Sequence, residues 1–182
     1  TPIMGGNDAH GKPCLRLLHD CGCIAHHRGR MIAAVSNPLS KKQPKRRIAV
    51  LGCSGSVGTQ ALSILAEHPD RFEVCLLAAN SSSESLAASA AAHRPVAACL
   101  TGCEQPPKLP AGTKWFHGEH GLLEALAASE PDTVLNAITG AAGLAASEWT
   151  LRHGLTLALA NKESLVVAGE YLMQLAAQTG AK

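Results

Sequence analysis

The sequence predicts an α/β protein built on a doubly wound, mostly parallel sheet. From Arg47 onward, short aliphatic or β-branched runs alternate with longer segments of helical period, which is the pattern of consecutive strand–helix–strand units. The first of these runs, 48–51, is apolar throughout, as is typical of a strand covered on both faces. A glycine-rich turn follows it directly, at the edge where such sheets bind ligands.

The later elements follow from the period of the apolar residues. Helical spacing predicts helices at 59–67, 83–92, 122–129, 143–153 and 163–178. Short apolar runs between them predict strands at 72–79, 96–100, 133–138 and 155–160, with a short extended piece at 115–116. This alternation supports one sheet rather than separate α and β layers.

Turn residues set the limits of these elements. The first helix is broken by His68–Asp70, and the second is expected to be capped by Ser81–Ser83 and to stop before Pro95. Three prolines make the stretch 101–112 a loop, and Gly180 ends the last helix.

The net charge of +2 is the sum of two segments of opposite charge. Residues 1–47 carry an excess of +7, whereas residues 48–182 carry −5. We interpret residues 1–46 as a basic, disordered leader, and residues 1–30 as non-native sequence upstream of a start at Met31. A transit peptide is the alternative, so a bacterial cytoplasm is expected and a plastid is the competing location.

Composition argues against two classes of partner. Aromatic residues make up only 3% of the chain, which disfavours a nucleic-acid stacking surface. No run approaches the ~18 apolar residues of a membrane span. We therefore expect neither nucleic acid nor membrane as a partner.

The seven cysteines are an odd number and follow no signal peptide, which favours a reducing compartment. A metal site is the alternative for a cluster near the N-terminus, although its Cys-x-Cys pair and adjacent histidines lack the spacing of structural zinc modules. The cluster consists of Cys14, Cys21, Cys23, His26 and His27.

The glycine-rich turn Gly52–Gly58 is the first chemistry-bearing motif. Glycines there let a phosphate approach backbone N–H groups at a helix N-terminus, which is the Rossmann-like mode of dinucleotide binding. The spacing G-x-x-G-x-x-G resembles variants found in NADP-linked reductases. Glycines that merely permit a tight turn are the alternative. Cys53, inside the turn, is interpreted as a small filler.

The end of the second strand indicates which dinucleotide is preferred. An NAD enzyme usually places a carboxylate there for the ribose hydroxyl, but this chain has Asn80-Ser81-Ser82 and no acid before Glu84. A neutral segment does not repel a 2′-phosphate, so NADPH is favoured over NADH. Asn80 could instead serve only the turn.

Two further polar or small segments follow later strands at the same predicted edge. Asn136–Gly143 is rich in small residues that admit a ligand or another backbone. Asn161-Lys162-Glu163 opens the last helix, where Asn161 is as well suited to capping that helix as to binding a ligand. No triad or carboxylate pair emerges, so no catalytic residue is assigned in this chain.

Three motifs in order resemble the N-terminal part of the 1-deoxy-D-xylulose 5-phosphate reductoisomerase family: 48–58, 137–144 and 159–166. The resemblance implies an NADPH-dependent enzyme of isoprenoid biosynthesis. Such an enzyme rearranges and reduces 1-deoxy-D-xylulose 5-phosphate to 2-C-methyl-D-erythritol 4-phosphate, with divalent Mg or Mn holding the substrate oxygens and a homodimer at full length.

The resemblance also implies roles for individual residues. The cofactor-binding positions are Ser54, Gly55, Ser56, Val57, Asn80, Ser81, Ser82, Asn161 and Glu163. The first four would cradle the cofactor's phosphates, the next three would surround the 2′-phosphate, and the last two would contact the cofactor further along. Lys162 would bind the substrate and offset its negative charge.

The family's metal-binding Asp-Ser-Glu would lie beyond Lys182. Residues 47–182 are therefore expected to be an NADPH-binding domain truncated before the catalytic and C-terminal helical domains, able to bind the cofactor without turnover. A stand-alone nucleotide-binding or regulatory module, or an unrelated NADP-linked reductase, is the alternative.

Overall fold

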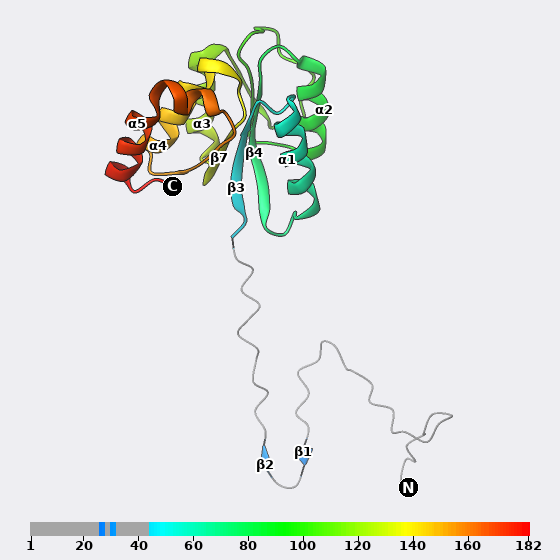
Figure 1. The fold of residues 1–182 in the computed structure, drawn as a ribbon. Coiled ribbons are helices and arrows are strands. Elements are labelled where there is room, and N and C mark those ends of the chain that lie inside the picture. Colours follow the sequence, from blue (N-terminus) through cyan, green and yellow to red (C-terminus); the bar gives the residue numbers. More distant parts are fainter. Residues whose placement is uncertain (1–25, 28–29, 32–43) are drawn as a thin grey trace. The chain divides into compact units, whose positions relative to one another are not determined.

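The computed structural model describes residues 26–27, 30–31 and 44–182 (Figure 1). The chain divides into two units at Lys42–Gln43. In the first, β1 (His26–His27) pairs antiparallel with β2 (Arg30–Met31). Most of the predicted leader 1–46 lies outside the described residues, and so do Cys14, Cys21 and Cys23 of the metal-site alternative.

The second unit is built on a six-stranded parallel sheet with the order β6-β5-β4-β3-β7-β8. The strands are β3 (Arg46–Leu51), β4 (Phe72–Ala79), β5 (Ala97–Leu100), β6 (Lys114–His117), β7 (Thr133–Asn136) and β8 (Thr156–Leu159). The order reverses at β3, because β4 lies on one side of it and β7 on the other. The predicted doubly wound α/β fold is thus confirmed, with every strand of this sheet parallel.

Helices cover both faces of the sheet (Figure 1). They are α1 (Ser56–Glu67), α2 (Ser83–His93), α3 (Gly118–Ser129), α4 (Leu144–Arg152) and α5 (Lys162–Thr179). Leu62 of α1 and Leu86 of α2 pack into one buried cluster, whereas Leu126 of α3 and Ala146 of α4 belong to the cluster on the opposite face. The central strands are therefore buried on both sides, as their apolar sequences predict.

Several helix limits differ from the prediction. The first helix begins at Ser56 rather than at residue 59, and α3 begins at Gly118 rather than at residue 122. A 3-10 turn, Gly140–Gly143, precedes α4. The predicted serine capping of α2 is wrong, because Ser82 occupies the cap position without a side-chain hydrogen bond.

The last helix, α5, packs on α4 through Leu172 and Leu175. Its backbone is kinked at Ala168, where φ is −140°. The segment before the kink carries exposed apolar side chains, and Val166 is 86% exposed. Among the described residues, no helix is both long and apolar enough to cross a membrane.

Candidate nucleotide-binding site

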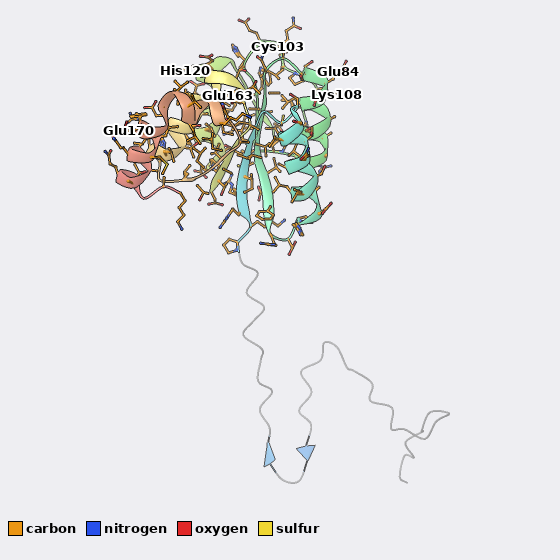
Figure 2. The ribbon with its side chains drawn as sticks, in the orientation of Figure 1. Glu84, Cys103, Lys108, His120, Glu163 and Glu170 are labelled. Atoms are coloured by element: carbon orange, nitrogen blue, oxygen red, sulfur yellow. The ribbon has the colours of Figure 1, made fainter. Side chains whose placement is uncertain are left out.

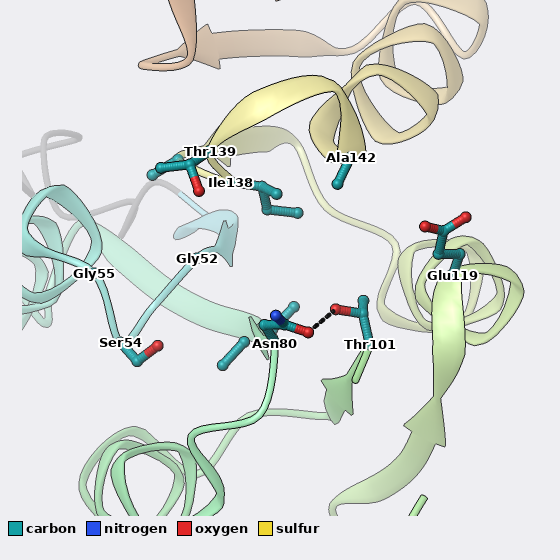
Figure 3. A pocket seen from close by; sticks show the side chains of 12 residues that line it. Gly52, Ser54, Gly55, Asn80, Thr101, Glu119, Ile138, Thr139 and Ala142 are labelled. Atoms are coloured by element: carbon teal, nitrogen blue, oxygen red, sulfur yellow. Dashed lines mark hydrogen bonds between the residues drawn. The ribbon is translucent and has the colours of Figure 1, made fainter. Parts of the chain in front are cut away.

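The carboxyl ends of four neighbouring strands surround a pocket of about 400 Å³ (Figure 3). It is lined by Gly52, Ser54, Gly55, Ala78, Ala79, Asn80, Thr101, Glu119, Ala137, Ile138, Thr139 and Ala142. The pocket lies above β3, where the strand order reverses. In open α/β sheets this is the place where ligands bind.

The glycine turn forms one wall of the pocket. Its backbone lies very close to the segment that follows β7. The N–H groups of Gly52 and Cys53 both donate to the carbonyl of Ala78, at 2.8 and 2.9 Å. Gly52 has φ +80°, and a Cβ there would lie 2.6 Å from the carbonyl oxygen of Ala137. A Cβ on Gly58 would overlap the carbonyl oxygen of Gly52. Glycine is therefore required at both positions.

The N-terminus of α1 opens at this wall without a capping side chain. Gly55 is the N-cap residue, and no acidic residue occurs in the first turn. The first N–H groups of a helix have no partner within the helix, and they carry the positive end of its dipole. The turn can therefore bind a phosphate. Of the four predicted phosphate-binding residues, Ser54 and Gly55 line the pocket, whereas Ser56 and Val57 lie in the first turn of α1 outside the lining.

Cys53 is fully buried within the turn, and burial raises the pKa of its thiol from 9.0 to about 11. At neutral pH this lowers the reactive thiolate about a hundredfold relative to an unshifted thiol. We expect Cys53 to resist alkylation at pH 8 and to react more slowly than Cys103, which is partly exposed. Peptide mapping after timed labelling measures both rates, and unfolding the chain should make them similar. Equal rates in the folded protein would contradict this expectation.

Asn80, at the end of β4, is the only one of the three predicted 2′-phosphate residues that lines the pocket. Ser81 and Ser82 lie beyond the lining and lead into α2. The Oδ1 atom of Asn80 accepts a hydrogen bond of 3.3 Å from the hydroxyl of Thr101 (Figure 3). The two strand ends β4 and β5 are thus joined by side chains as well as by the sheet.

Asn161 is buried at the start of α5, and all of its side-chain polar groups are bonded. Its Nδ2 donates to the carbonyl oxygens of Ile138 and Gly140, at 2.6 and 2.7 Å. Its Oδ1 accepts a hydrogen bond of 3.1 Å from the N–H of Ser164, which caps the helix. The capping interpretation is thereby confirmed, and a direct contact of Asn161 with the cofactor stays a prediction.

Asn136 also holds the segment that forms the pocket wall 138–142. The Nδ2 of Asn136 donates to the carbonyl of Gly143 and to the hydroxyl of Ser147, at 2.7 and 2.8 Å, and Ser147 also donates to Gly143. Asn136 and Ser147 are fully buried. Two buried asparagines, Asn136 and Asn161, thus bond the backbone of this segment.

Lys162 and Glu163 are exposed in the first turn of α5 and do not line the pocket. Glu163 is labelled in Figure 2. The structure therefore brings together Ser54, Gly55 and Asn80 from the predicted site, and leaves the α5 residues beside it. Within the described ranges, no three His, Cys, Asp or Glu side chains lie close enough together to hold a metal ion.

Two polar lining residues, Thr101 and Glu119, were not predicted from the sequence. Thr101 directly follows β5, so the rule that ligands bind at the carboxyl ends of strands could have identified it. Glu119 lies in the first turn of α3, after the edge strand β6, and its carboxylate faces the pocket (Figure 3). No motif in its sequence surroundings indicates this position.

Comparison with known proteins identifies relatives for the same region. Residues 48–169 match the family model of 1-deoxy-D-xylulose 5-phosphate reductoisomerase. The reductoisomerase of Xanthomonas axonopodis pv. citri is 43% identical over 144 residues, which cover 75% of this chain and 36% of that protein. The enzyme of Nitratidesulfovibrio vulgaris is 41% identical over 158 residues, covering 84% and 39%. The chain thus spans little more than a third of the length of these relatives.

Solved structures of similar proteins show the same fold. The reductoisomerase from Zymomonas mobilis in complex with NADPH aligns with a TM-score of 0.67 and 31% identity, covering 76% of this chain and 38% of that one. A DOX-P reductoisomerase in complex with magnesium aligns with a TM-score of 0.68 and 33% identity, covering 76% and 36%. The similarity therefore extends to the whole sheet-containing unit.

Proposed function

The chain belongs to the 1-deoxy-D-xylulose 5-phosphate reductoisomerase family, and on that premise we propose that residues 47–182 bind NADPH in the pocket at the carboxyl edge of the sheet. The observation that carries the proposal is the uncapped N-terminus of α1, which opens at the pocket behind a turn that only glycine can form. It would hold the cofactor's pyrophosphate.

The order of the strands orients the cofactor in this proposal. With the pyrophosphate at β3, the adenosine half would lie toward β4 and β5, beside Asn80 and Thr101. The nicotinamide half would lie toward β7 and the turn at 138–140. That direction leads to the start of α5, where Asn161 and Lys162 lie, which supports a role for Lys162 near the substrate.

In the full reaction of the family, NADPH supplies a hydride that reduces the rearranged sugar phosphate. The described residues would bind and orient the cofactor, and the ammonium of Lys162 would offset negative charge on the substrate. They offer no cluster that fits a metal ion.

Titration of the purified chain with NADPH and NADH, followed by calorimetry or nicotinamide fluorescence, tests the proposal. We expect saturable binding of NADPH and weaker binding of NADH. Binding that is absent, or equally tight for both dinucleotides, would overturn the assignment.

Replacing Gly55 by Asp would place a carboxylate at the phosphate site, and it should abolish binding without unfolding the chain.

Glu119 brings an unfavourable charge into the same pocket. NADPH is strongly anionic, so Glu119→Gln should lower its dissociation constant, by about twofold to threefold at low salt, with the gain shrinking as salt screens the repulsion. Glu67→Gln is the matched control, because Glu67 ends α1 about 16 Å from its N-terminus and away from the pocket. An unchanged affinity for Glu119→Gln would show that the carboxylate does not act on the cofactor.

A further inference from the structure

The amide group of Asn80 is exposed and is hydrogen-bonded to the end of the neighbouring strand. Beyond β4 and β5 the backbone pairing continues, since the N–H of Thr101 donates to Ala79 at 3.0 Å and the N–H of Gly102 donates to Asn80 at 2.9 Å. This pairing places the hydroxyl of Thr101 where it donates to Oδ1 of Asn80, at 3.3 Å. The hydrogen bond draws the acceptor end of the amide toward β5.

Gly102 leaves the space that this end of the amide occupies. A Cβ on Gly102 would overlap Oδ1 of Asn80 and would lie 3.2 Å from its Cγ. Oδ1 therefore lies directly against the backbone of Gly102, in space that only glycine leaves open. With Oδ1 held against β5, Nδ2 is turned away from Thr101 at the pocket wall (Figure 3).

An amide has one donor end and one acceptor end, so its orientation decides what it can recognise. The donor end forms a charge-assisted hydrogen bond with a phosphate oxygen, whereas the acceptor end would repel it. A carboxylate at this place in NAD enzymes does the reverse, because it accepts from the ribose hydroxyl. The orientation of Asn80 thus suits a phosphorylated ribose.

We propose that Thr101 and Gly102 are positioning residues that present the Nδ2 donor of Asn80 to the 2′-phosphate of the cofactor, and so set the preference for NADPH over NADH. The inference rests on the proposed function. It also accounts for selectivity at a strand end that carries no Arg or Lys, since Asn80-Ser81-Ser82 are all neutral.

The test compares the affinities of the full chain for NADPH and NADH. Thr101→Val keeps the shape of the side chain and removes the hydroxyl, so it should weaken NADPH by about fivefold to tenfold while NADH changes by less than twofold. Thr101→Ser keeps the hydroxyl and should restore the preference. Gly102→Ala displaces Oδ1 by contact and should cause the same selective loss, which provides a second route if Thr101→Val folds poorly.

The outcomes separate this inference from the proposed function. Failure of the unaltered chain to bind NADPH would overturn the proposed function, and the inference with it. Normal binding by the unaltered chain, together with variants that weaken both dinucleotides equally or neither, would overturn the positioning role alone. A failure of Thr101→Ser to restore selectivity would do the same.

Discussion

Gly52→Ala is expected to lower the free energy of unfolding by about 3 kcal/mol. A residue with a Cβ lowers the free energy of unfolding by about 1–2 kcal/mol when its backbone is left-handed. Forcing an extra atom into a packed site lowers it by about a further 1–3 kcal/mol. Both penalties apply here, because Gly52 has φ +80° and its Cβ would lie 2.6 Å from the carbonyl oxygen of Ala137. Denaturant unfolding with linear extrapolation measures the change.

Gly112→Ala is the matched control for this substitution. Gly112 also has a positive φ, +90°, but a Cβ there meets nothing within 4 Å. Its replacement should therefore cost about 1 kcal/mol, from the backbone strain alone. Equal losses for the two variants would show that the close approach of the glycine turn to Ala137 does not limit stability. The Gly52 variant should also lose NADPH binding in whatever fraction remains folded.

Asn161→Ala should destabilise the chain by a similar amount, about 3 kcal/mol. The substitution removes the cap of α5, which costs about 1 kcal/mol, and leaves two carbonyl oxygens without their donor, which costs about 1–3 kcal/mol. Those oxygens belong to Ile138 and Gly140 in the pocket wall. NADPH binding should therefore weaken as well, because the wall loses its support.

Asn161→Ser separates the two parts of this effect, since a serine can cap the helix but carries no amide donor for the turn. Asn161→Ser should therefore destabilise the chain by about 1 kcal/mol less than Asn161→Ala does. Gln174→Ala serves as the control on the same helix, because its side chain is exposed and bonds only to Glu170. Surface changes of this kind stay within about 0.5 kcal/mol. If Asn161→Ala changed the free energy of unfolding no more than Gln174→Ala did, the hydrogen bonds of Asn161 would not contribute to stability.

The strands could be predicted well because polar residues flank their apolar runs. The second predicted strand, 72–79, matches β4 residue for residue, since its apolar run is bounded by Asp70 and Asn80. The N-termini of α1 and α3 were placed too late, by three and four residues. Gly58 is a poor helix former, so the apolar period does not reveal that the helix includes it, whereas the close approach of Gly58 to the carbonyl oxygen of Gly52 requires glycine there.

The candidate site was predictable where it lies at strand ends. Ser54, Gly55 and Asn80 were found because polar or small residues followed apolar runs. Glu119 was missed because it enters from the first turn of a helix beyond the edge strand, which only the strand order brings to the pocket. For Asn161, the sequence left capping and ligand binding equally open, and only the positions of its partners show the cap.

The bonds of Asn161 also make two segments one cooperative unit of local unfolding. The turn at 138–140 and the first turn of α5 share this one side chain, so neither opens without breaking hydrogen bonds to the other. Their amide hydrogens should therefore exchange with solvent at linked rates. A ligand that rests on the turn should slow exchange at Ser164, which it need not touch. By linkage, it should tighten the binding of a second ligand near Lys162 by the same factor by which that second ligand tightens its own.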